Sequence, residues 1–221
     1  MASPKSGVFR EILLSSLLLG GFAVAGAALL AWTESQTRDR IANNIRRQIL
    51  DSLYEVLPRE THNNDLINAS FEVTDSELLG TDEPVTIYLA TMDGRPVGAL
   101  LNTVAPNGYT GAIKLLVGIY YDGRLAGVRV VEHRETPGLG DQIEITKTDW
   151  ITHFAGKSLN DPIPQLWAVK RDGGVFDQFT GATVTPRAVV KAVKNTLIYF
   201  DANKDALFNL LETETEETVA K

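Results

Sequence analysis

The stretch VTIYLATMDGRPVGALLNTVAPNGYTGAIKLLVGIYYDGRLAGVRVVE, residues 85–132, decides the fold, because it pairs extended runs around short Asp-Gly turns. The turns are Asp93-Gly94 and Asp122-Gly123. Asp-Gly between runs of alternating apolar residues is a strong signal for a β-hairpin. The extended runs cover residues 85–90, 96–104, 112–121 and 125–132. The sequence therefore predicts two hairpins and an antiparallel sheet.

Helical patterns follow the sheet, so the predicted fold class is α+β. Residues 186–200 place apolar side chains at intervals of three and four, with Thr185 as the expected N-cap and Pro186 at the first helical position. We also expect a helical stretch near Trp150–Phe154 and a short apolar strand at Leu166–Val169. The expected domain is thus an antiparallel sheet with packed helices.

An uncharged apolar run near the N-terminus predicts a transmembrane helix. Residues 12–32 read ILLSSLLLGGFAVAGAALLAW, and a helix of this length is about 31 Å long, which matches a hydrocarbon core of roughly 30 Å. Ala23-Val24-Ala25 resembles the cleavage site of a signal peptide. The apolar run continues past that site to Trp32, however, so a retained anchor is the preferred interpretation.

The predicted organisation divides the chain into five segments: residues 1–11, the anchor at 12–32, a linker helix and polar connector at 33–84, one globular domain at 85–203, and an acidic, solvated tail at 204–221. In the linker, apolar residues recur every fourth position from Ile41 to Leu57, and Pro58 stops the pattern. Lys and Arg counts on the two sides of the anchor do not favour an external C-terminal domain, but long domains cross membranes largely regardless of such charges. The orientation stays open at this point.

Composition excludes several classes of function. The net charge is −7 and the pI near 5.0, so the chain lacks the basic surface that nucleic-acid binding requires. It has no cysteine, which excludes disulfides, iron–sulfur clusters held by thiolates and cysteine-based zinc sites. The three histidines, His62, His133 and His153, lie too far apart in sequence to share a helix face.

A threonine-rich segment carries the first chemical signal. Thr180-Gly181-Ala182-Thr183 stands just before the expected start of the helix at Thr185. Backbone N–H groups and the positive end of the helix dipole would favour an anion such as phosphate at Thr183. Arg187 and Lys191 add positive charge to the first turns. A helix cap without any ligand would produce the same local pattern.

A second segment, Glu135-Thr136-Pro137-Gly138-Leu139-Gly140, follows a well-formed strand. Its two glycines flank a leucine, which predicts a loop whose backbone can approach a flat ligand closely. Taken alone, the pattern is also compatible with a surface turn. Its occurrence together with the threonine-rich segment favours a ligand site.

Four motifs together resemble a known family, the covalent-FMN domain found in the G component of the Rnf (Rsx) ion-translocating electron-transport complex and in the C component of the sodium-pumping NADH:quinone reductase. The motifs are GYTG at 108–111, VGIYYDG at 117–123, ETPGLGD at 135–141 and DQFTGATVT at 177–185. The resemblance covers the anchor and roughly residues 85–200. The short chain with its simple N-terminal anchor is more similar to the Rnf component than to the reductase component.

The resemblance implies the roles of the site residues. The last motif is similar to the flavinylation motif of the family, in which Thr183 takes one FMN through a phosphoester and Thr180 is the Ser/Thr position. Asp177 is its acidic residue, expected to be read by a flavin transferase that uses FAD and a divalent metal and releases AMP. Leu139 and Thr136 are expected to line the flavin ring. The remaining expected contacts are Glu135, Gly138, Gly140, Gly181, Ala182 and Thr185.

The resemblance also implies a function and a location. The chain would be an electron carrier, without catalysis of its own, in a complex that couples NADH or ferredoxin redox chemistry to ion translocation. Its partners would be other membrane subunits, one of them also flavinylated, and an iron–sulfur subunit. In this family the N-terminus is cytoplasmic and the FMN domain periplasmic, at a bacterial inner membrane. Since no ionisable residue lies between Ile12 and Trp32, the chain cannot form an ion pathway alone.

Two alternative functions belong to other classes of protein. One is a noncatalytic, membrane-anchored binding module that keeps the fold and carries no flavin. The other is a hydrolase with Thr183 as nucleophile, for which the spacing offers no Ser/His/Asp or Cys/His arrangement.

Overall fold

The computed structural model describes the backbone of residues 5–219 and the side chains of residues 10–38 and 40–209. The chain divides into two compact units, Met1–Ile49 and Leu50–Lys221, which are described separately. The elements are α1 (Lys5–Val56), η1 (Arg59–Thr61), β1 (Ser70–Asp75), β2 (Thr81–Met92), β3 (Arg95–Ala105), β4 (Ile113–Tyr120), β5 (Leu125–Glu132), η2 (Gly140–Ile143), η3 (Trp150–Phe154), η4 (Pro164–Leu166), η5 (Lys170–Asp172) and α2 (Val184–Val219). The predicted α+β class is confirmed.

The first unit consists of helix α1 up to Ile49. The anchor predicted at Ile12–Trp32 lies within this helix, and every side chain along it is exposed. The helix is long and apolar enough to cross a membrane. Apolar side chains that face outward all round are expected of a helix surrounded by lipid rather than by its own protein. Residues 1–4 of the predicted N-terminal segment lie outside the described residues.

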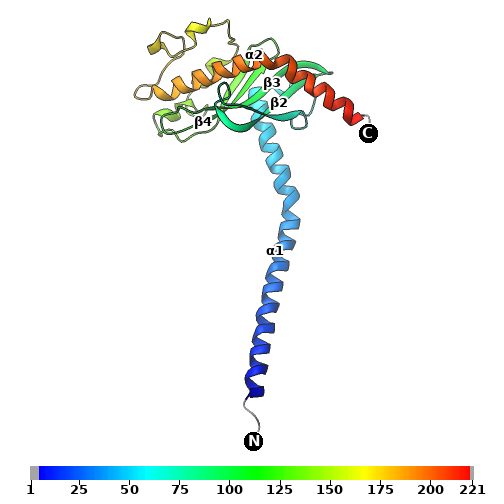
Figure 1. The fold of residues 1–221 in the computed structure, drawn as a ribbon. Coiled ribbons are helices and arrows are strands. Elements are labelled where there is room, and N and C mark those ends of the chain that lie inside the picture. The colour runs from blue at the N-terminus through cyan, green and yellow to red at the C-terminus, as the bar shows by residue number, and fades with distance from the viewer. Residues whose placement is uncertain (1–4, 220–221) are drawn as a thin grey trace. The chain divides into compact units, whose positions relative to one another are not determined.

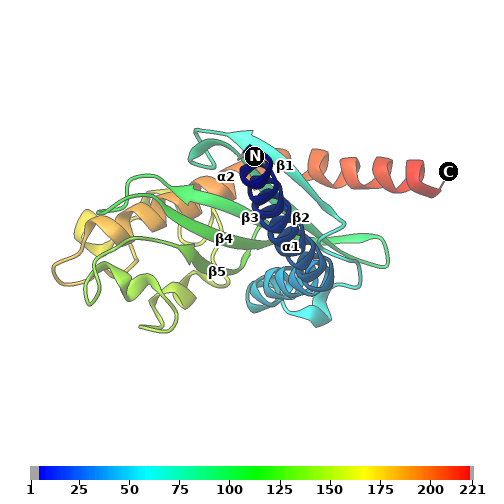
Figure 2. The same cartoon turned by 90° about the horizontal axis from the view of Figure 1, so that it is seen from below.

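The second unit is built on a five-stranded antiparallel sheet in the order β1-β2-β3-β4-β5, and Figure 2 shows the strands side by side in this order. Met92 pairs with Arg95 across the first Asp-Gly turn. Asp93 and Gly94 there have φ angles of 51° and 76°, the positive pair that a type I′ hairpin turn requires. Both predicted hairpins are confirmed. Strand β1 was not predicted, because SFEVTD is short and half polar.

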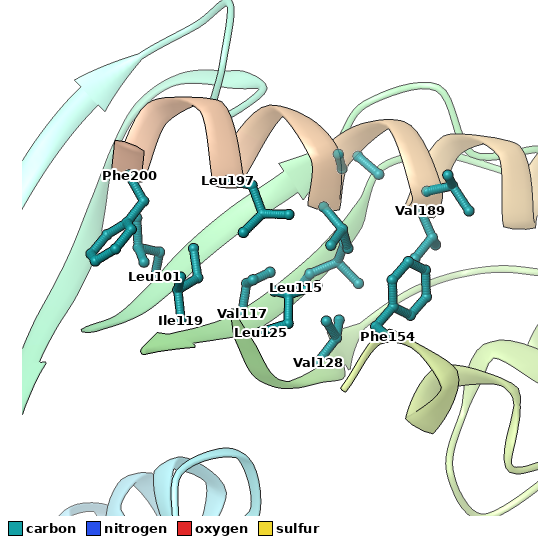
Figure 3. Packing of buried hydrophobic residues seen from close by; sticks show 14 of the residues in the cluster. Leu101, Leu115, Val117, Ile119, Leu125, Val128, Phe154, Val189, Leu197 and Phe200 are labelled. Carbon is teal, nitrogen blue, oxygen red and sulfur yellow. The ribbon is translucent and has the colours of Figure 1, made fainter. Parts of the chain in front are cut away.

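Helix α2 covers one face of the sheet (Figure 1) and encloses the main core. Val189, Leu197 and Phe200 point from α2 toward the strands, and Phe154 of η3 closes one end of the core (Figure 3). The strand side of this core includes Leu101, Leu115, Val117, Ile119, Leu125 and Val128. The predicted spacing of apolar residues along α2 is therefore confirmed as its buried stripe.

The last turns of α1, which belong to the second unit, pack on the opposite face of the sheet. Leu53 and Val56 are buried there, and so is Leu57, just before Pro58. A Cβ added to Gly118 of β4 would lie 2.5 Å from Val56 Cγ1, so a glycine is needed at this crossing. Because apolar residues are buried on both faces, β4 is continuously apolar and buried from Leu115 to Ile119 rather than strictly alternating. Helix α1 runs through the first part of the predicted linker, as far as Val56.

Two local predictions were wrong. Helix α2 begins at Val184, so Thr185 lies inside its first turn and is not the N-cap. Residues 166–169 form no strand; η4 ends at Leu166, and Val169 makes only an isolated bridge with Phe176. The backbone of α2 continues through the predicted tail to Val219, whereas the side chains from residue 210 onward lie outside the described residues.

Candidate functional site

The two motif segments meet in one cavity of about 130 Å³ beside the start of α2. One side of the cavity is the loop after β5, and the other is the segment that leads into the helix. The lining residues are Tyr109, Glu135, Thr136, Leu139, Gly140, Gly181, Ala182, Thr183, Val184 and Thr185. Segments about fifty residues apart in sequence thus form a single site, as their joint occurrence suggested.

The first side, here called the polar wall (residues 133–140), is a tight turn held by polar contacts. The N–H groups of Leu139 and Gly140 both donate to the Thr136 carbonyl oxygen, at 3.1 Å each. Pro137 stands at the second turn position, and Gly138 at the third has a φ of +77°. This is the arrangement of a type II turn, which needs a residue without a Cβ at the third position. The turn leaves the Leu139 side chain half exposed at the cavity.

The second side, here called the aromatic-backed wall (residues 177–183), is also a tight turn. Ala182 N–H donates to the Phe179 carbonyl oxygen at 3.1 Å, and Gly181 has a φ of +81°. The wall rests on Trp150, whose indole N–H donates to the Asp177 carbonyl oxygen at 2.8 Å. The rings of Trp150 and Phe179 meet edge to face at 5.2 Å. Apolar burial therefore fixes this wall from behind.

The buried carboxylate of Glu135 joins three segments at the cavity. Its Oε1 accepts hydrogen bonds from Thr110 N–H at 3.0 Å and from the Thr110 hydroxyl at 3.4 Å. Its Oε2 accepts a short hydrogen bond from the Thr185 hydroxyl. Glu135 is only 4% exposed. The GYTG loop, the polar wall and the first turn of α2 are consequently held together through one side chain.

Two glycines allow this close arrangement. A Cβ on Gly140 would lie 2.7 Å from Glu135 Oε2 and 2.9 Å from Thr185 Oγ1. A Cβ on Gly108 would lie 2.2 Å from the Gly111 carbonyl oxygen. Neither position has room for a side chain, so the glycines of GYTG and of ETPGLG serve close packing around Glu135.

A histidine supports the polar wall from outside the cavity. His133 Nδ1 accepts the Glu135 N–H at 3.0 Å, which places the ring proton on Nε2, and Nε2 donates to Glu144 Oε1 at 2.7 Å. This hydrogen bond lowers the pKa of the Glu144 carboxyl below its usual value. His133 therefore connects the backbone of the polar wall to a surface carboxylate.

Thr183 stands at the start of α2. Its carbonyl oxygen accepts the first helical hydrogen bond, from Arg187 N–H at 3.3 Å, so Thr183 occupies the cap position that was predicted for Thr185. Its side chain is half-buried and lines the cavity. In the part of the chain that the structure describes, its hydroxyl makes no hydrogen bond to another residue. The hydroxyl is thus available for a ligand.

The positive charge expected from Arg187 is used elsewhere. Its guanidinium binds both carboxylate oxygens of Asp172, at 2.6 and 2.9 Å. This contact lowers the pKa of Asp172 and raises that of Arg187. The proposed help of Arg187 in binding an anion is therefore wrong for this arrangement, whereas the helix terminus still supplies positive potential.

Three expected site residues do not line the cavity. Gly138 shapes the polar wall, and Thr180 is exposed in the turn of the aromatic-backed wall. Asp177 is exposed and pairs with Lys170 at 2.6 Å. Conversely, Tyr109 and Val184 line the cavity but were not predicted as site residues. Tyr109 lies in the GYTG motif, so the motif itself carried a signal for it.

Comparisons with known proteins show the family of the chain. Residues 108–198 match a family described as the FMN-binding domain, and residues 1–56 match the RnfG N-terminal region. Fold and site thus define an FMN-binding domain attached to an N-terminal membrane helix. More particularly, the chain belongs to the RnfG family, the G component of the ion-translocating oxidoreductase complex.

Relatives named as this G component support the assignment over nearly the whole chain. The one from Pseudomonas aeruginosa is 50% identical over 198 residues, which are 90% of this chain and 92% of that protein. Those from Shewanella loihica and Aliivibrio fischeri are 46% and 45% identical, covering 90% and 91% of this chain and 94% and 97% of theirs. The family resemblance is confirmed, in its Rnf form. The chain is an electron-transport subunit of an ion-translocating complex and a single-pass membrane protein.

Proposed function

We propose that Thr183 carries one FMN through a phosphoester and that the chain relays electrons between other subunits of its complex. The observation that supports this most directly is the half-buried Thr183 hydroxyl, which lines the cavity with no hydrogen-bond partner in the described part of the chain. In the attachment step, the Thr183 oxygen bonds to the FMN phosphorus of FAD. The pyrophosphate bond of FAD breaks, and AMP leaves with the hydroxyl proton.

The start of α2 fits a phosphate. The first N–H groups of a helix lack intrahelical partners, and the helix dipole is positive at this end. Both effects stabilise an anion at the Thr183 position. Gly181 faces Leu139 across the cavity, and a Cβ on Gly181 would be 3.5 Å from Leu139 Cδ2. The approach to the hydroxyl is therefore narrow.

The cavity is too small to enclose a whole flavin. Pockets that bury a drug-sized ligand measure about 300–1,000 Å³, whereas this one measures about 130 Å³. The ring would consequently lie at the mouth, beside the exposed side chains of Tyr109, Leu139 and Val184. FMN supplies one- and two-electron transfer when it is bound. A ring at the surface suits exchange with another subunit, and covalent attachment prevents its loss.

Mass spectrometry of the full chain, made together with a flavin transferase, tests the attachment. We expect the intact mass to rise by one FMN less one water, and fragmentation to localise the increase to Thr183 in the tryptic peptide 172–187. Thr183→Ala should abolish in-gel flavin fluorescence, because the accepting oxygen is gone. Thr183→Ser keeps a hydroxyl and should retain partial attachment.

The thermal unfolding of Thr183→Ala provides the control, and it should match that of the wild type because the Thr183 side chain makes no hydrogen bond that the fold needs. Flavin fluorescence that persists in Thr183→Ala would contradict the proposed bond. A wild-type chain without added mass after exposure to the transferase would instead favour the noncatalytic anchored module.

Partners and location complete the proposal. We infer that an iron–sulfur subunit and further membrane subunits exchange electrons with this domain, and that NADH or ferredoxin chemistry drives ion translocation by the assembly. The exposed position of Asp177 suits recognition by the transferase. We further infer that the FMN domain lies on the periplasmic side of a bacterial inner membrane, with residues 1–11 in the cytoplasm.

The absence of cysteine allows a direct test of orientation. A single cysteine placed at the exposed position Asn160, outside the cavity, should react in intact inverted membrane vesicles only after detergent is added. In spheroplasts the same cysteine should react at once with a membrane-impermeant maleimide. The reverse pattern would place the domain in the cytoplasm.

A further inference from the structure

We propose that the buried carboxylate of Glu135 lowers the reduction potential of the FMN bound in this cavity. The inference rests on the proposed function and adds a role for one residue. Glu135 lines the cavity together with Thr183 and Thr185, so its charge lies in the same cavity at whose mouth the ring would sit. The hydrogen bonds by which Glu135 joins the loops could also be made by a neutral side chain, so they do not by themselves require a charged residue at position 135.

The hydrogen-bond pattern accommodates an ionised carboxylate. Oε1 faces the Thr110 N–H, which can only donate, and Oε2 accepts from the Thr185 hydroxyl. The carboxylate thus receives hydrogen bonds on both oxygens, which stabilises the charged form in a buried place.

No cation neutralises this charge within the described part of the chain, where Glu135 takes part in no ion pair. Three basic residues around the two walls are engaged with other acids, and Arg134, next to Glu135 in sequence, is exposed and makes no ion pair with it in the described part of the chain. Lys147 lies 3.6 Å from Asp141, Lys170 pairs with Asp177, and Arg187 pairs with Asp172. Only neutral N–H and hydroxyl groups compensate Glu135.

A fixed negative charge in a poorly solvated place opposes the addition of electrons nearby. Coulomb interactions are weakened much less in such a site than in water, so the effect reaches a neighbouring group. The direction of this effect on the reduction potential does not depend on which edge of the flavin ring is nearest to Glu135. Glu135 therefore favours the oxidised state of the bound group and makes its reduced state a stronger donor.

Glu135→Gln in the full, flavinylated chain tests the inference. Gln is isosteric and keeps both ties, because its oxygen can accept the Thr110 N–H and its amide can donate to the Thr185 hydroxyl. Redox titration at alkaline pH, where proton uptake compensates least, should show a higher midpoint potential. We expect the equilibrium constant for reduction to rise about tenfold, which corresponds to about 30 mV for a two-electron couple.

Two further variants separate charge from structure. Glu132→Gln removes the same charge from an exposed residue that pairs with Lys114 at 2.7 Å, and solvent screening should leave the potential unchanged. Thr185→Val removes the hydroxyl donor to Oε2 while keeping the charge and the shape of the side chain. It should shift the potential in the opposite direction, downward.

An unchanged potential in flavinylated Glu135→Gln would overturn the inference, since a purely structural role predicts that result. Should Glu135→Gln fail to fold or to take flavin, Thr185→Val decides: a downward shift supports the inference and no shift overturns it. A wild-type chain that takes no flavin overturns the proposed function, and this inference with it. That failure shows up as an unchanged mass before any titration.

Discussion

The two walls of the cavity have the same turn geometry but are held in opposite ways. In each, a glycine with positive φ occupies the third position of the turn, Gly138 in the polar wall and Gly181 in the aromatic-backed wall. The polar wall is held by hydrogen bonds that join its own residues Glu135 and His133 to the surface carboxylate of Glu144. Behind the aromatic-backed wall lies Trp150, packed against other rings.

The difference implies a division of tasks. Apolar burial depends little on pH, so the rings behind the aromatic-backed wall support the position of Thr183 across the pH range in which the domain is folded. Hydrogen bonds to ionised groups respond to proton concentration and place charge where it acts on a ligand. The polar wall can therefore change the electrostatic environment of a ligand at Thr183, whose position the aromatic-backed wall fixes.

The largest expected effect comes from breaking the aromatic-backed wall. Trp150 is 4% exposed and contacts Phe154 and Phe179 at 5.3 and 5.2 Å between ring centroids. Trp150→Ala should lower the free energy of unfolding by about 3–5 kcal/mol, because it removes a large buried side chain and leaves a cavity. Chemical denaturation followed by circular dichroism measures this change.

Trp150→Phe is the matched control. It keeps an aromatic ring and loses the hydrogen bond to the Asp177 carbonyl oxygen, at 2.8 Å, so the expected loss is about 1–2 kcal/mol. The loss in Trp150→Ala should be the same at acidic and neutral pH wherever the domain folds. Equal stability of Trp150→Ala and the wild type would show that the ring cluster does not support the wall.

The contrast also explains how far the fold could be predicted from the sequence. The hairpins were predictable because Asp93-Gly94 and Asp122-Gly123 specify their turns locally. Strand β1 was not predicted, because its pairing with β2, and not its own sequence pattern, makes it a strand. Thr185 looked like a cap because threonine before proline favours one. Its hydroxyl instead binds Glu135, a contact across 50 residues that no local pattern contains.

The same limit applies to the site. The motifs identified both walls, because glycines at turn positions leave a local signature. They did not show that Arg187 is held by Asp172, or that Glu135 is buried without a cation, since both depend on which distant segments meet. Local chemistry was therefore predictable, while the electrostatics of the assembled site required the fold.

The smallest expected effect concerns the outer edge of the polar wall. The hydrogen bond from His133 lowers the pKa of Glu144 from its usual 4.5 in the folded protein. A carboxyl with a lowered folded pKa contributes stability above its unfolded pKa, and this contribution disappears as the pH falls through the folded value. Glu144 is partly exposed, so screening limits the contribution to roughly 0.2–1 kcal/mol.

Glu144→Gln measures that contribution, because Gln can still accept the proton of His133 Nε2 but carries no charge. At neutral pH the variant should unfold slightly more easily than the wild type, and below the usual pKa of a glutamate the two should converge. The loss in Trp150→Ala should not vary in this way, so the two variants compared across pH distinguish the walls directly. A loss of unfolding free energy in Glu144→Gln that persists undiminished at acidic pH would mean that the shape of the Glu144 side chain, and not its charge, stabilises this edge. Charge would then distinguish the polar wall from the aromatic-backed wall only at Glu135.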